Sequence, residues 1–165
     1  MRAKQYLSSL LETPLHGSTE GLGDTAAAGR AHGRRLAALA LPADREYLAL
    51  ARMSAMHVAG LLDFPVGSVI DLRLAVDEAC SVFLAGPDGH GQAEQPGAAP
   101  GMLELAFETD GAQLQVTVRG AAPPHWPEPD DVGWAMLKAL VGELRAEVDD
   151  GLGTLTLIGP LPRAR

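Results

Sequence analysis

Three side chains able to do chemistry stand within one helical turn of each other: the carboxylates Asp77 and Glu78 and the thiol Cys80. Carboxylates take up and release protons, and a thiolate can attack a substrate. A nucleophilic cysteine needs an activating base beside it. None is adjacent in the sequence, so we expect Cys80 to be a small buried hydrophobe. The carboxylate pair remains as the candidate for proton transfer, and its role depends on the element that carries it.

That element is predicted to be an amphipathic helix over residues 66–84. Its apolar residues recur at helical spacing at Leu72, Val76, Ala79 and Phe83. Residues four apart lie on one face of a helix, so Glu78 shares its face with Val82. Without a metal ion or a nucleotide beside it, Glu78 would be only a polar residue at a shallow cleft, or the partner of a nearby arginine.

The composition is that of one folded domain. The chain has 165 residues, 47% of them hydrophobic, and a formal net charge of −8. Direct binding of nucleic acid needs a basic surface, so we exclude it. No apolar run is long enough for a membrane span and the N-terminus lacks the apolar core of a signal peptide, so we expect no membrane association. A single cysteine excludes an internal disulfide and favours a cytoplasmic location.

Three segments are predicted along the chain. Residues 1–33 have little to bury and are expected to be a flexible N-terminal tail. Residues 34–160 form the folded domain, and residues 161–165 are a short tail. Within the domain, residues 85–100 are a polar loop rich in glycine and proline. His90 in this loop has no nearby ligand partner, so we expect no metal site.

The folded domain is predicted to alternate helices with short strands. Strands are expected at 36–41, 102–108, 114–119, 143–148 and 154–158, and helices at 45–62, 66–84 and 131–141. Asp44 and Asp131 are expected as helix caps, and Asp110-Gly111 as a hairpin turn. This order predicts an α/β two-layer sandwich, with three helices on one face of a mostly antiparallel sheet.

The order of elements, together with Leu74-Ala75-Val76-Asp77-Glu78-Ala79-Cys80-Ser81, resembles the anti-sigma factor serine/threonine kinases. These are bacterial members of the GHKL, or histidine kinase-like, ATPase superfamily. The resemblance covers about residues 34–160 and implies a Bergerat-type ATPase fold. It also implies a homodimer, although no residue indicates one.

The helix motif of this family contains a glutamate general base and, four residues later, an asparagine that holds Mg²⁺. Glu78 stands at the base position, so the resemblance assigns it the role of a catalytic base, at most a vestigial one. Val82 stands at the asparagine position. Mg²⁺ takes oxygen ligands in tight octahedral geometry, and valine offers no oxygen.

The family motif Asp-x-Gly-x-Gly, which binds adenine, follows the strand that residues 114–119 resemble. Its aspartate and two glycines correspond to Gly120, Ala122 and Pro124. An adenine amine left without its acceptor costs about 1–3 kcal/mol. Pro124 also has no N–H group and a fixed φ angle. This stretch therefore lacks the groups with which the family holds adenine.

Of the phosphate-binding Gly-x-Gly-Leu motif only Gly133 remains, with Trp134 beside it, while Thr154 keeps the Gly-Thr start of the last strand. The metal ligand, the adenine acceptor and the phosphate-loop glycines are thus all missing. Together these losses weaken nucleotide binding by several powers of ten. We therefore expect no cofactor.

The leading hypothesis is an anti-sigma-like regulator that controls transcription by binding a sigma factor or an anti-anti-sigma factor, with its kinase activity lost. The expected docking residues lie on the first long helix: Arg45, Glu46, Arg52, Met53 and Met56. Exposed methionines suit adaptable interfaces, although Met53 and Met56 could equally be core residues.

Two alternatives remain open. The first is an active serine/threonine kinase of an anti-anti-sigma factor, with ATP and Mg²⁺ in a divergent site. The second is a small-ligand sensor whose vacated pocket is lined by Val82, Trp126 and Trp134.

Overall fold

The computed structural model of the chain describes residues 33–84, 101–128 and 131–162. The expected N-terminal tail up to residue 32, the loop with His90 and residues 163–165 lie outside the described residues. No helix within the three described ranges has the length and apolar character that a membrane crossing needs.

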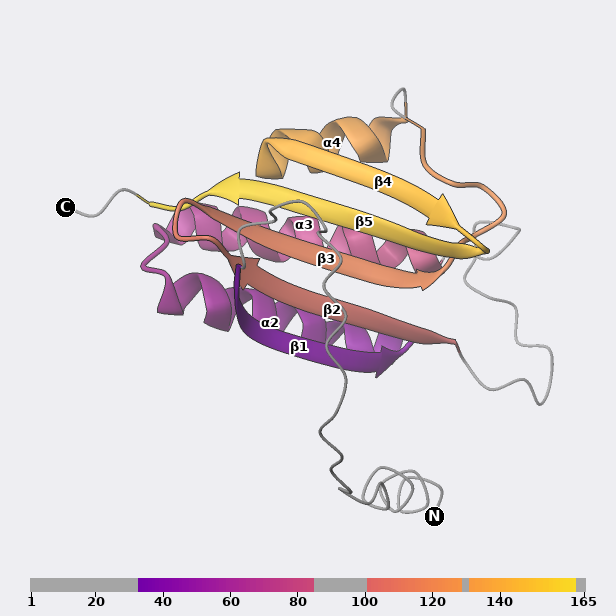
Figure 1. Cartoon of the computed structure of the whole chain (residues 1–165), viewed down its shortest axis with the longest axis horizontal. Coiled ribbons are helices and arrows are strands. Elements are labelled where there is room, and N and C mark those ends of the chain that lie inside the picture. The colour runs from indigo at the N-terminus through magenta and orange to yellow at the C-terminus, as the bar shows by residue number, and fades with distance from the viewer. Residues whose placement is uncertain (1–32, 85–100, 129–130, 163–165) are drawn as a thin grey trace, which may run out of the picture.

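Five strands form one antiparallel sheet in the order β1-β2-β3-β5-β4 (Figure 1). The strands are β1 (Arg34–Pro42), β2 (Met102–Thr109), β3 (Gln113–Ala121), β4 (Glu143–Asp149) and β5 (Leu152–Pro160). β2 and β3 form one hairpin, and β4 and β5 form another. β1 pairs with β2, although α2 and α3 lie between these two strands in the sequence. The sequence predicted all five strands, with ends within about two residues of those observed.

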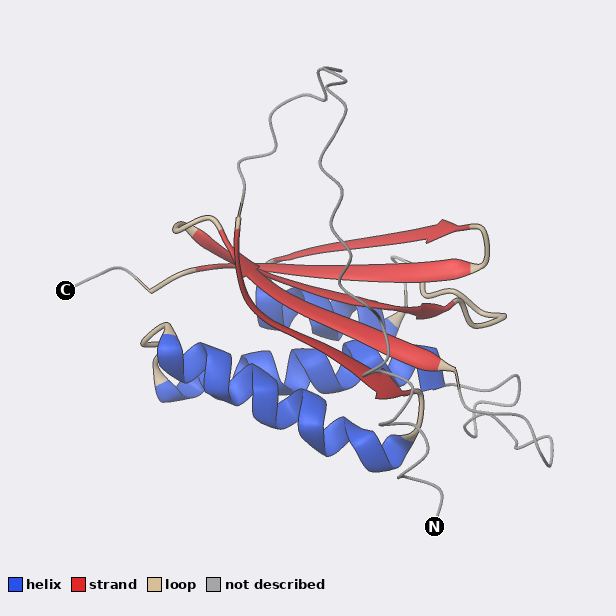
Figure 2. Cartoon of the chain, turned by 60° about the horizontal axis from the view of Figure 1, so that its bottom comes forward, coloured by secondary structure: helices blue, strands red, loops and turns tan. Residues whose placement is uncertain are grey.

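Three helices cover one face of this sheet (Figure 2). They are α2 (Leu48–Leu61), α3 (Val66–Leu84) and α4 (Val132–Val141), and a single 3-10 turn, η1 (Arg45–Tyr47), precedes α2. The Asp44 carboxylate accepts a hydrogen bond from the Glu46 N–H at 2.9 Å, which caps this first turn as expected. The predicted two-layer α/β sandwich is confirmed.

The core lies between the sheet and the helices. On the inner face of the sheet, alternate residues such as Phe107, Val118 and Leu155 are fully buried. The helices meet them with small residues, among them Ala55 and Ala75, which are also fully buried. Small side chains on the helices let the larger strand residues fill the layer between them, and each large side chain so buried stabilises the fold by roughly 1.5–3 kcal/mol.

The predicted hairpin turn at Asp110-Gly111 is confirmed. The Asp110 carboxylate accepts hydrogen bonds from the N–H groups of Ala112 and Gln113, each at 2.9 Å, and Gly111 takes a φ angle of 91° that favours glycine. The two backbone donors lower the pKa of Asp110. The turn fixes the register of β2 against β3, and this register determines what surrounds Gly120 at the far end of the hairpin.

Candidate functional site

The residues singled out by the resemblance gather at one end of the sandwich. Glu78 and Val82 lie in the second half of α3, Gly120 near the end of β3 and Gly133 in the first turn of α4. We call this end of the molecule, on the right in Figure 1, the Glu78 end.

Glu78 and Val82 lie on the flank of α3 that faces α4. The direction of this flank follows from Asp71, which lines a hollow together with Leu140 of α4. Glu78 is seven positions further along α3 and therefore on the same flank. Both Glu78 and Val82 are half-buried, and Val82 packs against the core. Within the described ranges, no three His, Cys, Asp or Glu side chains are placed to hold a metal ion.

The two carboxylates of the pair lie on different flanks of α3. Asp77 Oδ1 accepts a hydrogen bond from Arg52 Nη1 on α2 at 2.9 Å, and the two side chains are 27% and 34% exposed. Because water reaches both groups, this ion pair contributes at most about 1 kcal/mol. Asp77 thus joins α3 to α2, whereas Glu78 lies on the flank of α3 that faces α4.

Cys80 is buried in the core, as its sequence context predicted. Burial raises the pKa of its thiol to about 12, and the negative charge of Asp77 adds to the shift. The thiol is therefore protonated at neutral pH and does not act as a nucleophile.

We expect the Cys80 thiol to make the protein less stable above pH 9. Its pKa is about 12 in the folded chain against an ordinary value of 9.0, so unfolding releases a proton above pH 9. The stabilising contribution is complete below pH 9 and is lost as the pH rises toward 12, by up to about 1.4 kcal/mol per pH unit. Urea unfolding of the wild type and Cys80→Ala at several pH values measures this slope. Parallel pH dependences of the two proteins would contradict it.

Gly120 is buried, and its surroundings leave little room for a side chain. A Cβ atom on this residue would lie 2.8 Å from Leu103 Cδ2 and 3.1 Å from Phe83 Cδ1. Both neighbours belong to the core, so a side chain at residue 120 would point into packed apolar atoms. A carboxylate at this position, as the resemblance implies for the family, would meet these apolar side chains.

The loop after β3 folds back across the end of the sheet. The Ala122 N–H donates a hydrogen bond to the Gly151 carbonyl at 2.9 Å, which ties the loop to the β4–β5 turn. Trp126 then packs edge-on against Phe83, with ring centroids 5.8 Å apart and an interplanar angle of 66°. Its ring also covers Gly153, where a Cβ atom would overlap Cζ3 and Cη2 of the indole. An aromatic ring therefore fills the space between α3 and the start of β5.

Pro124, at the position of the second motif glycine, is exposed on this same loop, while Ala122 is half-buried. Trp134 is half-buried and packs against the core. Of the three residues expected to line a vacated pocket, Val82, Trp126 and Trp134, all are half-buried and pack against the core.

Asp131 is the N-cap residue of α4, but its carboxylate makes no hydrogen bond to the helix. Asp131 Oδ2 accepts a hydrogen bond from the Glu128 N–H at 2.8 Å and makes no side-chain bond to α4. Asp131 therefore takes the N-cap position as expected, while its carboxylate bonds the preceding loop. Gly133 is exposed, and a Cβ atom there would meet nothing within 4 Å. Nothing in the described surroundings requires glycine at this position.

Thr154 lies on the other side of the sheet. Its neighbours on β5, Gly153 and Leu155, are buried toward the helices, so Thr154 points to the opposite face. The strand register places it between Arg119 and Glu147. The sheet thus separates Thr154 from Glu78, and the structure does not bring the two together.

The expected docking residues lie at the surface of η1 and α2. Arg45 and Glu46 are exposed on η1. Met53 and Met56 are 65% and 45% exposed, so both are surface residues and not core. Arg52 is the exception, because its guanidinium is bound to Asp77, a partner 25 residues away that the sequence did not indicate.

Comparisons with known proteins place the fold. No protein-family model matches the chain, and no curated protein does. Among solved structures, the chain resembles the crystal structure of the RsbU and RsbW domains of Rv1364c from Mycobacterium tuberculosis, with a TM-score of 0.57 and 18% sequence identity. The match covers 76% of this chain and 31% of that one. At this identity the likeness shows a shared fold, and the α/β sandwich agrees with the architecture that the resemblance implied.

Proposed function

We propose that this chain is a partner-switching regulator in a sigma-factor pathway that acts by binding proteins and not by phosphorylating them. Its partners are a sigma factor and an anti-anti-sigma factor, which compete for one surface. The observation that carries the proposal is a set of exposed, large apolar side chains on α2 and α3.

These side chains come from two antiparallel helices held in a defined register. Arg52 and Asp77 face each other across the pair. One helical turn further from this contact, Met56 comes about level with Leu74, and another turn on, Gly60 comes about level with Ile70. The two helices run side by side on one face of the sheet (Figure 2), so exposed residues on their outer sides lie along both helices, away from the sheet.

We call this surface the docking face, and define it by seven apolar residues that are 38% to 77% exposed. They are Leu50, Met53, Met56 and Leu61 of α2, and Val66, Ile70 and Leu74 of α3. A contiguous exposed apolar surface of this kind usually marks a protein interface. Arg45 and Glu46 at the start of the helix pair add charges at its border.

Two methionines at the centre of the docking face suit a regulator with two partners. A methionine side chain is unbranched and polarizable, and adapts its shape to different surfaces. A face that one partner covers is closed to the other, so competition alone switches between them. Such a switch needs no covalent modification.

Three features of the Glu78 end support the loss of nucleotide chemistry. Val82 offers no oxygen to Mg²⁺, a carboxylate at Gly120 would overlap core atoms, and the Trp126 ring lies over Gly153. These residues do not fit a magnesium–ATP complex, so we derive no catalytic step for Glu78.

The docking proposal is tested with purified sigma factors and anti-anti-sigma factors of the same organism in a direct binding assay. We expect at least one of each class to bind, and binding of the first to exclude the second. Met53→Glu and Met56→Glu place a charge in the apolar face and should each weaken binding by about 30-fold, the effect of losing one interface hot spot.

Met136→Glu is the matched control, because Met136 is a 41% exposed methionine on α4, outside the docking face. It should leave both affinities unchanged. If no sigma factor and no anti-anti-sigma factor binds, or if Met136→Glu weakens binding as much as Met56→Glu, the proposal is wrong.

The loss of nucleotide chemistry has its own test in calorimetry with ATP and Mg²⁺. We expect no measurable heat of binding at millimolar nucleotide. Micromolar binding, with turnover that disappears in Glu78→Ala, would support the active-kinase alternative instead.

A further inference from the structure

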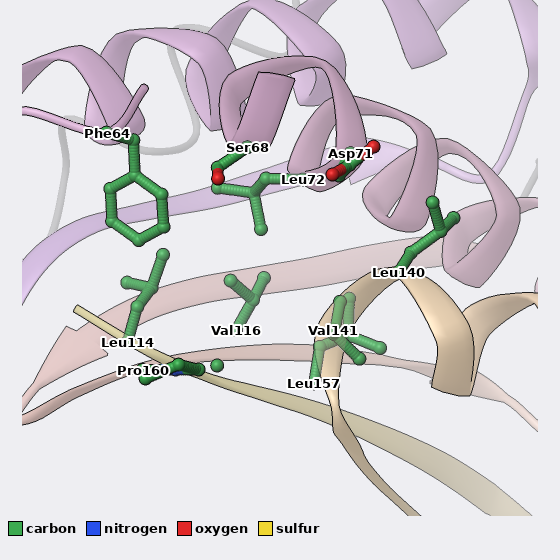
Figure 3. A pocket seen from close by; sticks show the side chains of 11 residues that line it. Phe64, Ser68, Asp71, Leu72, Leu114, Val116, Leu140, Val141, Leu157 and Pro160 are labelled. Carbon is green, nitrogen blue, oxygen red and sulfur yellow. The ribbon is translucent and has the colours of Figure 1, made fainter. Parts of the chain in front are cut away.

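A second feature of the molecule lies at the end opposite to Glu78. There the start of α3, the end of α4 and the inner face of the sheet leave a hollow of about 140 Å³ (Figure 3). From the sheet, Leu114 and Val116 point toward Phe64, which precedes α3, and toward Leu72 of α3. Neither the proposed docking face nor the Glu78 end includes this hollow.

The volume and lining of the hollow limit what it can hold. Sites for drug-sized ligands usually measure about 300–1,000 Å³, so this one is too small for a nucleotide. An apolar cavity of about 150 Å³ takes up a molecule as small as benzene. Most of the lining is aliphatic or aromatic, so the part of a ligand that enters must be apolar and no larger than about one ring.

Two polar side chains, Ser68 and Asp71, line the same hollow, and both come from α3 (Figure 3). Asp71 is exposed, and Ser68 is half-buried, so they stand at the mouth and not at the floor. A carboxylate with a hydroxyl one helical turn away favours a positively charged hydrogen-bond donor. The chemistry of the mouth thus complements an ammonium group attached to a small apolar body.

We propose that this hollow binds a small primary amine, with its apolar part between α3 and the sheet and its ammonium group at Asp71. Because α4 supplies Leu140 and Val141 to the lining, a bound amine contacts both helices that flank the space. The proposal does not depend on the proposed function, since none of the lining residues belongs to the docking face.

The experiment compares three probes of the same size and different charge: benzylamine, benzyl alcohol and benzoate. Each is titrated into the ¹⁵N-labelled full chain, and amide shifts are followed by NMR. We expect saturable shifts around residues 68–72, 140–141 and 157–159, with benzylamine binding about two- to five-fold more tightly than benzyl alcohol. Benzoate should bind most weakly, because its charge is repelled by Asp71.

Two variants separate the two parts of the site. Asp71→Asn should remove the advantage of benzylamine over benzyl alcohol, whereas Asp149→Asn, at an exposed carboxylate on β4, should leave it intact. Val116→Phe should fill the hollow and abolish binding of all three probes. If Val116→Phe does not fold, Leu140→Trp at the half-buried rim serves the same purpose. Equal affinities for the three probes, shifts away from the hollow, or binding that survives both filling variants would overturn the proposal.

Discussion

Replacing Gly120 by aspartate is expected to lower the free energy of unfolding by more than about 4 kcal/mol, enough to unfold most of the protein. Two costs add. The new Cβ atom would lie 2.8 Å from Leu103 Cδ2, and overpacking of this kind costs about 1–3 kcal/mol. The carboxylate would then enter a region of apolar core atoms without a partner, which costs several kcal/mol more. Urea unfolding followed by circular dichroism measures the sum.

Two controls separate these costs. Gly120→Ala introduces only the Cβ atom, so its loss of stability gives the steric part alone. Gly133→Asp makes the same change at an exposed glycine with open space around it and should alter stability by less than about 0.5 kcal/mol. A Gly120→Asp protein that is stable and binds ATP would mean that the end of β3 can open toward a nucleotide, against our proposal.

Replacing Gly153 by valine is expected to cost about 3 kcal/mol, the upper part of the usual range for overpacking. A Cβ atom at this position would overlap the Trp126 ring and lie 3.0 Å from Phe83 Cε1. Valine is a good strand residue, so a loss of stability here reflects the missing space and not strand propensity. Displacement of the indole into water should also shift its fluorescence to longer wavelength.

A double-mutant cycle identifies Trp126 as the cause. If the indole is what the introduced valine side chain meets, then Trp126→Ala should relieve at least about 1 kcal/mol of the cost of Gly153→Val. Thr154→Val, on the open face of the same strand, is the matched control and should change stability little. Strictly additive effects of the two substitutions would show that Trp126 does not occupy this space in solution.

Much of the fold could be predicted from local patterns. The strands alternate apolar and polar residues, Asp44 precedes a helix, and Asp110-Gly111 separates two alternating runs. Each signal lies within a few residues of the structure it predicts. The α/β order then followed from the succession of elements, because few arrangements bury the apolar faces of helices and strands in this order.

The candidate site could be predicted only in part, because its determinants are distant in the sequence. The exclusion of a side chain at Gly120 depends on Leu103, which the β2–β3 register brings beside it. The Asp131 carboxylate could bond either the first amides of α4 or the loop before the helix. It accepts its hydrogen bond from the Glu128 N–H in that loop, which the sequence did not indicate. The position of Trp126 depends on a proline-rich loop with no periodicity to indicate its path.

The docking face was also partly hidden in the sequence. Apolar residues occur nearly all around α2 and α3, so spacing alone could not tell which methionines face the core. The answer depends on where the sheet lies and on the Arg52–Asp77 contact, both of which join distant parts of the chain.

The connection of β1 to the sheet has a kinetic consequence. Pro42 pairs with Met102, sixty positions later in the chain, whereas both hairpins and the α2–α3 pair close over short segments. Long-range contacts form slowly, because the entropy of closing the intervening chain is lost before the contact is made. We therefore expect β1 to add last during folding, onto a nucleus in which β2 is still an unpaired edge. That intermediate, and not the native protein, is the species most prone to aggregate during refolding.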